Sequence, residues 1–215
     1  MIEPIARADD PRISPFTHVG DHEWLRAHGF FVAEGRLVVR RLLETGRFPV
    51  HAILLTPAAL QGYGGAIDTD APVFVAEPEI LEQITGFNFH RGCLALAHRP
   101  PDDVATGRFL RSELLLAFEG VGNPDNVGGL FRVAAAFEAD GLLLDPRCGD
   151  PFYRKAVRTS MGATLKVPFE RAAPWPAVLE EYKAMDFTVV ALTPGSEAAP
   201  LAEFAPAARF PLIVM

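Results

Sequence analysis

The chain has 215 residues, of which 49% are hydrophobic, and a net charge of −7. This composition suits one large or two small domains, and no apolar run is long enough to cross a membrane. The first residues carry acidic side chains and no apolar core, so they do not resemble a signal peptide. Cys93 and Cys148 lack metal-type spacing, and we expect buried free thiols in a cytoplasmic protein.

The N-terminal part divides into an arm and a small domain. Residues 1–29 contain several prolines, which predicts an irregular arm that docks through Trp24. Residues 30–98 alternate between strand and helix patterns, which predicts a small α/β sandwich. Strands are expected at 30–33, 51–55, 72–75 and 92–97, and helices at 77–84 and 35–46, the latter with an apolar stripe of Leu37, Val38, Leu42 and Leu43.

A Pro-rich polar segment at 99–108 is interpreted as a linker. Beyond it, residues 109–215 alternate again, which predicts a parallel sheet with helices on both faces. The expected strands are 113–118, 141–144, 165–167, 187–192 and 211–215, and the expected helices are 126–138, 152–160 and 175–184.

The most informative segment is 123–137, with the sequence NPDNVGGLFRVAAAF. It follows an apolar strand pattern and predicts a helix with Asn126 as its N-cap. Gly128 and Gly129 each disfavour a helix by roughly 1 kcal/mol relative to alanine, so they mark a close approach of backbone or ligand. Arg132 is a long cation in an otherwise small and apolar segment. A strand, an Asn- and Gly-containing turn and this helix together indicate a ligand-handling site.

This segment resembles the first motif of the SpoU/TrmH-type RNA 2′-O-ribose methyltransferases of the SPOUT superfamily. Residues 31–35, 89–92 and 157–163 are similar to further blocks of that family. The resemblance implies a ribosomal-protein-like substrate-binding domain over 30–98 and a SPOUT (α/β knot) domain over 109–215. It also implies S-adenosyl-L-methionine as cofactor, methyl transfer to a ribose 2′-hydroxyl of rRNA or tRNA, and a homodimer for the full-length protein. The catalytic residues that it implies are Asn126 and Arg132.

One departure from the family concerns the C-terminus. Family members carry a Gly-x-Glu-Gly-x-Gly-Leu-Ser stretch and a later Ser-Leu-Asn stretch, whereas this sequence ends on an apolar segment at 210–215. We therefore expect a SPOUT domain without its final knot segment, in which Leu212, Ile213 and Val214 lack their usual cover. A non-catalytic RNA-binding remnant and a nucleotide-dependent oxidoreductase remain alternatives.

Candidate binding residues follow from position and from the resemblance. The loop of Thr193, Pro194 and Gly195 follows an apolar strand, and the resemblance places it beside the cofactor's adenosine; a plain turn has the same sequence features. Glu119 ends the first strand of the second domain, at the edge where parallel sheets bind ligands. It is a candidate RNA contact or a solvated loop residue.

Arginine-rich clusters indicate RNA contact despite the acidic total charge. One cluster spans 147–166 and another spans 36–47; a solvated helix face is the alternative for both. The pair His90-Arg91 lies beside Phe87 and Phe89, a combination that suits base stacking, with a structural histidine as the alternative. The histidines show no ligand-pair spacing, so no metal site is expected. The candidate RNA contacts, besides Glu119, are Arg36, Arg40, His90, Arg91, Arg158 and Ser160.

Overall fold

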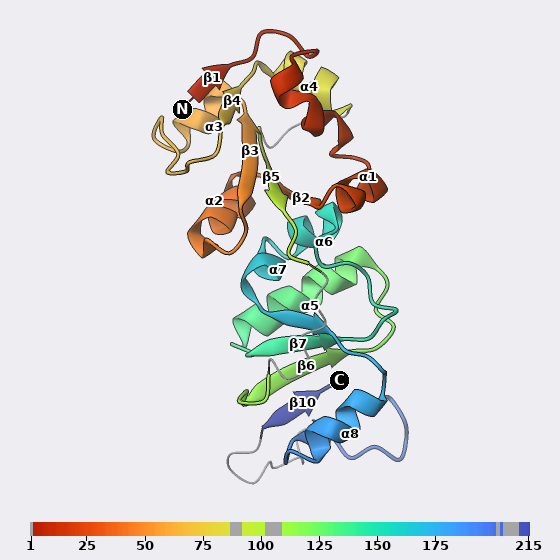
Figure 1. Ribbon diagram of the computed structural model, residues 1–215. Helices are drawn as coiled ribbons and strands as arrows, with labels where there is room; N and C mark the ends of the chain where they lie inside the picture. Colours follow the sequence, from red (N-terminus) through yellow and green to blue (C-terminus); the bar gives the residue numbers. More distant parts are fainter. Residues whose placement is uncertain (1, 87–91, 102–108, 201–202, 204–210) are drawn as a thin grey trace.

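The computed structural model describes residues 2–86, 92–101, 109–200, 203 and 211–215. These residues form two five-stranded sheets, one from each half of the chain. Figure 1 shows the sheets at opposite ends of the molecule, with two short helices, α6 and α7, between them. No helix within the described part of the chain is long and apolar enough to cross a membrane. The two short helices are α6 (Arg154–Thr159) and α7 (Ala163–Lys166).

The N-terminal sheet has the strand order β1-β4-β3-β5-β2, and β5 runs in the opposite direction to the other four strands. Its central strands are buried on both faces. Ile53 and Ala95 point into one core and Leu54 and Leu96 into the other, as the two-residue period of a strand requires. The strands are β1 (Ile2–Pro4), β2 (Phe30–Glu34), β3 (Val50–Leu55), β4 (Val73–Val75) and β5 (Cys93–His98).

Helices cover both faces of this sheet. Helix α2 buries Val38, Val39 and Leu42 against one core, whereas Leu37 is 43% exposed. The predicted stripe was therefore wrong at Leu37, because the buried face is centred one residue further along the helix. Helix α4 packs on the other core, and α3 was not predicted. The helices are α2 (Arg36–Thr45), α3 (Pro57–Gln61) and α4 (Pro78–Thr85).

The first 29 residues are not the irregular arm that the prolines predicted. Besides the edge strand β1 they form a 3-10 helix and a helix, because proline is tolerated at the start of a helical segment. Ile13, Phe16 and Leu25 are buried in the core of the N-terminal sheet. Trp24, the expected anchor, is partly buried and stacks on the His18 ring, with centroids 4.1 Å apart. The segments are η1 (Pro11–His18) and α1 (His22–Ala27).

The second sheet is fully parallel, as predicted, with the strand order β8-β7-β6-β10-β9. Successive residues of β7 enter different cores, since Leu142 and Leu144 pack with α5 while Leu143 packs with α8. The elements are β6 (Leu114–Phe118), α5 (Pro124–Ala136), β7 (Gly141–Leu144), β8 (Phe169–Arg171), α8 (Ala177–Lys183), β9 (Thr188–Val190) and β10 (Leu212–Val214).

One strand predicted for the second domain was wrong. Residues 165–167 are not a strand, since Leu165 belongs to α7 and β8 begins only after Pro168. A residue before proline avoids the helical region, so α7 ends at Lys166 and Val167 is extended. β10 is covered on one face, where Ile213 is fully buried with Tyr182 of α8, whereas Leu212 and Val214, which were also expected to lack their cover, are only partly buried. β10 pairs with β6 on one side and β9 on the other.

The two halves of the molecule share one hydrophobic core. Phe152, Val157 and Leu165 of the second half pack in the same buried cluster as Phe31 and Leu42 of the first. Polar contacts cross the same boundary, and they are all short. The contacts are Arg154 Nε to Glu34 Oε2 (2.9 Å), Arg99 Nη1 to Asp150 Oδ2 (2.6 Å), Arg41 Nη1 to Met161 O (2.6 Å) and Arg47 Nη1 to Lys166 O (2.8 Å).

Candidate functional site

The carboxyl edge of the parallel sheet has a topological switch point between β6 and β10. From β6 the chain moves outward to β7 and β8, and it then crosses to β9 and β10 on the other side of β6. Sheets of this kind bind ligands outside the carboxyl ends of the strands at such a point. Glu119 follows β6 and the loop of Thr193 and Gly195 follows β9, so these two candidates flank the switch point.

The loop after β6 leads directly into helix α5. Pro124 occupies the first helical position, where its fixed φ and missing N–H suit a helix start. The N-cap is Asn123, whose side-chain oxygen accepts a hydrogen bond from the Asp125 N–H at 2.8 Å. The prediction that Asn126 caps the helix was therefore wrong. Asn126 lies in the first turn, and its side chain is exposed beside the sheet edge, which leaves its amide available for another partner.

The two glycines of α5 differ in their surroundings. A Cβ on Gly128 would lie 2.7 Å from the Ala156 carbonyl oxygen and 2.9 Å from the Ser160 nitrogen. Gly128 therefore permits the close packing of α5 on α6. A Cβ on Gly129 would meet nothing within 4 Å. Only the first glycine is required by packing within the chain, and the second leaves an open place on the exposed face of α5.

Arg132 is exposed on α5 and borders a groove of about 670 Å³ between α2 and the pair α5 and α7. Six residues of helix separate it from Asn126, which places the two side chains about 120° apart around the axis. The outer face between them carries Val133, 46% exposed, and Phe137, 75% exposed. Arg132 makes no ion pair with any residue that the structure describes, so its guanidinium is available to an anion.

Carboxylates organise the loops at the sheet edge. Glu119 Oε1 accepts a hydrogen bond from Arg147 Nη2 at 3.1 Å, and Arg147 Nε donates to Asp145 Oδ2 at 3.0 Å. Asp145 is buried, which by itself raises its pKa, but hydrogen bonds from Cys148, the Gly120 backbone and Arg147 outweigh burial and lower the pKa. The ionised Asp145 thus fixes the loop after β7, and through Arg147 it orients Glu119.

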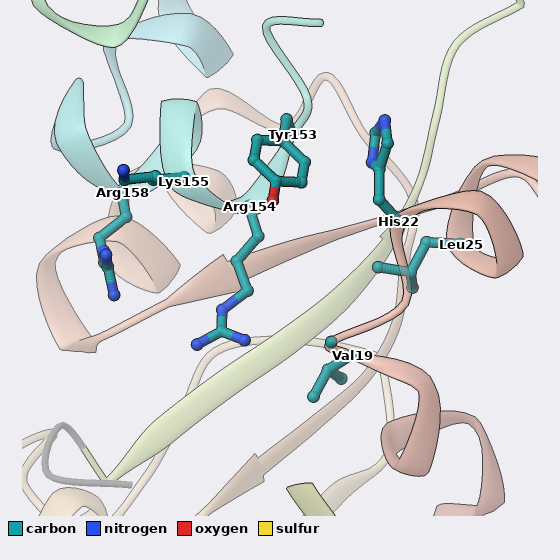
Figure 2. A pocket seen from close by; sticks show the side chains of 8 residues that line it. Val19, His22, Leu25, Tyr153, Arg154, Lys155 and Arg158 are labelled. Carbon is teal, nitrogen blue, oxygen red and sulfur yellow. The ribbon is translucent and has the colours of Figure 1, made fainter. Parts of the chain in front are cut away.

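A cavity of about 190 Å³ lies between α6 and the N-terminal segment around α1. In Figure 2 the side chains of Arg154 and Arg158 extend from α6 in the same direction, with His22 and Leu25 across from them. Arg154 is held by Glu34, whereas Arg158 Nη1 is 3.9 Å from Glu34 Oε2 and its side chain is 37% exposed. The cavity lining contains Arg154, Lys155 and Arg158. Lys155 Nζ pairs with Asp125 Oδ2 at 2.7 Å, so carboxylates outside the lining offset part of this positive charge, and the exposed Arg158 is the cation best placed to meet an anion.

The loop after β9 is open to solvent. Thr193 Oγ1 accepts a hydrogen bond from the Gly195 N–H at 3.3 Å, and the Leu192 N–H donates to the Met215 carbonyl at 2.7 Å. The second bond ties the loop to the end of β10. Leu192 is 57% exposed beside these backbone groups.

Sequence and structure comparisons point to one family. The SpoU rRNA Methylase family model matches residues 113–214. A protein of Mycobacterium bovis named an uncharacterized tRNA/rRNA methyltransferase is 33% identical over 207 residues, which cover 94% of this chain and 72% of the relative. The chain belongs to the SpoU rRNA methylase family. The predicted family and the predicted activity class, RNA methyltransferase, are thereby confirmed.

Solved structures of SpoU-type methylases share the fold. An rRNA methyltransferase from Sinorhizobium meliloti superimposes with a TM-score of 0.77 at 19% identity, covering 99% of this chain and 80% of that one. The SpoU methyltransferase AviRb from Streptomyces viridochromogenes gives a TM-score of 0.75 at 20% identity, covering 95% and 79%. These likenesses confirm the predicted SPOUT-type α/β fold.

The remaining candidate RNA contacts of this SpoU methylase differ in how accessible their side chains are. Ser160 is fully buried and its Oγ donates to the Val157 carbonyl at 2.9 Å, so it cannot reach RNA in this conformation. Arg36 and Arg40 are exposed on α2, and the Arg40 guanidinium lies 5.8 Å from the Tyr63 ring centroid. His90 and Arg91 lie outside the described residues.

Sequence reasoning on this SpoU methylase missed the partners of its charged residues. Asp145 was not singled out, although its place after a parallel strand is the same signal that identified Glu119. The basic clusters were found, but their pattern does not tell which arginines bind carboxylates and which remain available. No cluster of three metal-ligating side chains occurs in the described ranges. Both cysteines are buried, and burial raises the pKa of each thiol to about 11.

Proposed function

We propose that this SpoU methylase transfers the methyl group of S-adenosylmethionine to a ribose 2′-hydroxyl of rRNA or tRNA, in the cytoplasm and as a homodimer. The observation that carries the proposal is the position of Arg132 within the family-matched segment. It is an exposed cation without a carboxylate partner among the described residues, on the helix that begins at the sheet edge. Such a guanidinium is free to address the phosphate and hydroxyl of a nucleotide.

The chemistry requires alignment more than a strong acid or base. Bound S-adenosylmethionine supplies an electrophilic methyl group, and the ribose hydroxyl must approach it in line while losing its proton. We assign Arg132 to binding a phosphate beside the target ribose and to stabilising the developing oxyanion. A guanidinium stays protonated, so this role does not require it to act as a base. Asn126 would orient the hydroxyl through its exposed side-chain amide.

The sheet edge is the proposed place of the cofactor. Thr193, Pro194 and Gly195 would hold the adenosine, supported by the exposed side chain of Leu192 and the tie between the loop and β10. Glu119, held by Arg147 at 3.1 Å, would accept a hydrogen bond from a ribose hydroxyl of the RNA at the same edge.

The N-terminal half is the proposed RNA-gripping domain. Arg158 faces the basic cavity between the halves, and Arg36 lines an adjoining cavity that Arg158 also borders. Arg40 is exposed one turn further along α2. These positions support contacts to the sugar–phosphate backbone. We extend the proposal to His90 and Arg91 from their sequence pattern alone.

The proposed dimer uses the outer face of α5. Val133 and Phe137 form an exposed apolar patch there, and Gly129 leaves the face flat enough for close approach. A second copy of the chain is the partner that the family resemblance implies. The patch lies beside Asn126 and Arg132 on the same helix, so the two active centres of a dimer would lie close to its interface.

A methyl-transfer assay tests the proposal. The protein is incubated with tritium-labelled S-adenosylmethionine and either total rRNA or total tRNA, and cofactor binding is measured by titration calorimetry. We expect label in the RNA, none in a 2′-deoxy version of the modified fragment, and saturable cofactor binding. RNA binding without transfer would indicate a non-catalytic RNA-binding protein, and binding of NAD in place of S-adenosylmethionine would indicate an oxidoreductase.

A further inference from the structure

The groove beside Arg132 has a volume of about 670 Å³, within the range of roughly 300–1,000 Å³ typical of ligand sites. It is lined by residues of α2, α5 and α7, together with Arg47 and Gly162. Four cations border it and a single carboxylate, Glu44. The cations are Arg41, Arg47, Arg132 and Lys166. The protein as a whole has a net charge of −7, so this local excess of positive charge is not a consequence of composition.

Arg41 keeps its positive charge available in this groove. Its Nη1 donates to the Met161 carbonyl at 2.6 Å. A carbonyl oxygen orients a guanidinium but carries no net charge, so this bond holds Arg41 in place and preserves its attraction for an anion. Lys166 is exposed and makes no ion pair with a described residue.

Small residues make up much of the groove's lining. They are Ala135, Ala136, Gly162 and Ala163. Small side chains leave room for a bulky sugar–phosphate chain to approach the cations of the same groove. The walls are rigid relative to each other, because Leu42 of α2 and Leu165 of α7 are fully buried in the same core.

The groove continues along the boundary between the two halves. Gly162 borders it, and the adjacent residue Met161 borders the neighbouring cavity together with Arg36 and Arg158. Arg158 also lines the basic cavity of Figure 2. Two cavities thus share Arg158, and the second adjoins the groove of Arg132 where Met161 meets Gly162. An extended polyanion matches this arrangement better than a single small anion does.

We infer that this groove binds the sugar–phosphate backbone next to the target nucleotide and so leads RNA held by the N-terminal half to Arg132. The inference rests on the proposed function and adds to it Arg41, Lys166 and Glu44 as residues that set RNA affinity. Arg41 and Lys166 contact phosphates. Glu44 opposes binding through its negative charge and limits the affinity of the groove.

Two exposed positions allow a test in both directions without disturbing the fold. Lys166→Ala removes a positive charge from the groove, and Glu44→Lys replaces its negative charge by a positive one. The matched control is Lys183→Ala on α8, whose side chain is exposed and pairs with Glu180 at 2.8 Å. Surface pairs of that kind contribute little to stability. Binding of a fluorescein-labelled mixed-sequence RNA hairpin is measured by anisotropy over a series of salt concentrations, and thermal unfolding is recorded for every variant.

We expect Lys166→Ala to weaken RNA binding on the order of fivefold and to reduce the slope of log K against log salt by about one. Glu44→Lys should strengthen binding and increase that slope, whereas Lys183→Ala should match the wild type. Equal affinities and slopes for the wild type and both groove variants would overturn the inference, as would a wild type that does not bind the hairpin.

Cofactor binding separates this inference from the proposed function. If the groove variants change RNA affinity as expected but the protein binds no S-adenosylmethionine and transfers no methyl group, the groove is supported and the proposed function fails. If methyl transfer to RNA occurs and Lys166→Ala leaves both the KM for RNA and the salt slope unchanged, the proposed function stands and the groove is wrong.

Discussion

On its inner face, helix α5 buries Val127, Phe131 and Ala134 completely, whereas its outer face exposes Asn126, Val133 and Phe137. Both faces come from one continuous motif. The inner face meets the parallel sheet and α6, and each of its side chains has a partner within the chain. The outer face has an amide and apolar side chains open to solvent, and Arg132 borders a basic groove beside it. A motif found in a sequence therefore mixes residues that build the helix packing with residues available to ligands, and only their surroundings separate the two.

Of the substitutions on the two faces of α5, that of Arg132 should have the largest effect, and the effect should be on catalysis. Arg132→Ala should lower methyl transfer about 10²- to 10³-fold, the loss typical when one donor to a developing oxyanion is removed, while cofactor affinity stays unchanged. Arg132→Lys should also be strongly impaired, because a point charge does not reproduce the fork of donors. Single-turnover rates and calorimetry check both. Near-normal turnover of the Lys variant would show that the role assigned to Arg132 is wrong.

A substitution on the inner face of α5 should lower the stability of the fold. Gly128→Ala places a Cβ 2.7 Å from the Ala156 carbonyl oxygen, so α5 and α6 must separate. Such overpacking should lower the free energy of unfolding by about 2 kcal/mol. Thermal and urea denaturation followed by circular dichroism measure this value. A variant as stable as the wild type would mean that the two helices have room to adjust.

A smaller effect is expected on association. Phe137→Asp puts a charge in the exposed apolar patch of α5 and should convert a dimer to a monomer without lowering the stability of the fold. Phe137 is 75% exposed, so the change removes little packing within the chain. Light scattering on a sizing column gives the mass of each form. Leu110→Asp is a control at another exposed apolar position, 46% exposed. A wild type that is monomeric at high concentration contradicts the proposed interface.

The smallest effect should have the opposite sign. Gly129→Ala adds a methyl group where nothing lies within 4 Å, so it should raise the stability of the monomer by about 1 kcal/mol through helix propensity. The measurement is made in the Phe137→Asp background, so that association does not contribute. Loss of stability similar to that of Gly128→Ala would show that the two glycines are not distinguished by packing.

The sequence predicted the elements whose signal is local. The apolar run of β6, the helix α5 and most of the alternation of the second half were predicted to within about two residues, because apolar periodicity and length specify them. The exception is the strand expected at 165–167, which lies in α7. The predictions were wrong where the position of a residue depends on an adjacent residue or on a packed helix. Asn123 rather than Asn126 caps α5 because Pro124 begins the helix, and Ser160 is buried because α6 packs against α5 through Gly128.

Long-range contacts explain the rest of what the sequence did not predict. The pairing of Arg154 with Glu34 joins residues 120 positions apart, and no local sequence pattern predicts it. The same is true of Arg41 and the Met161 carbonyl. Basic clusters could be found from spacing alone, but the division between arginines that hold the two halves together and those that remain for RNA depends on the packed structure.

The shared core at the boundary has a consequence for domain exchange. Phe152, Val157 and Leu165 complete a core that begins with residues of the first half, and Arg41 and Arg47 grip backbone carbonyls of the second. An N-terminal half taken from another methylase would have to present a matching apolar surface and two arginines at the same places. The N-terminal half therefore cannot be exchanged to change RNA specificity without also changing the shared core. A chimaera joined in the segment 99–108 would have mismatched residues at the boundary between its halves as well as a new substrate.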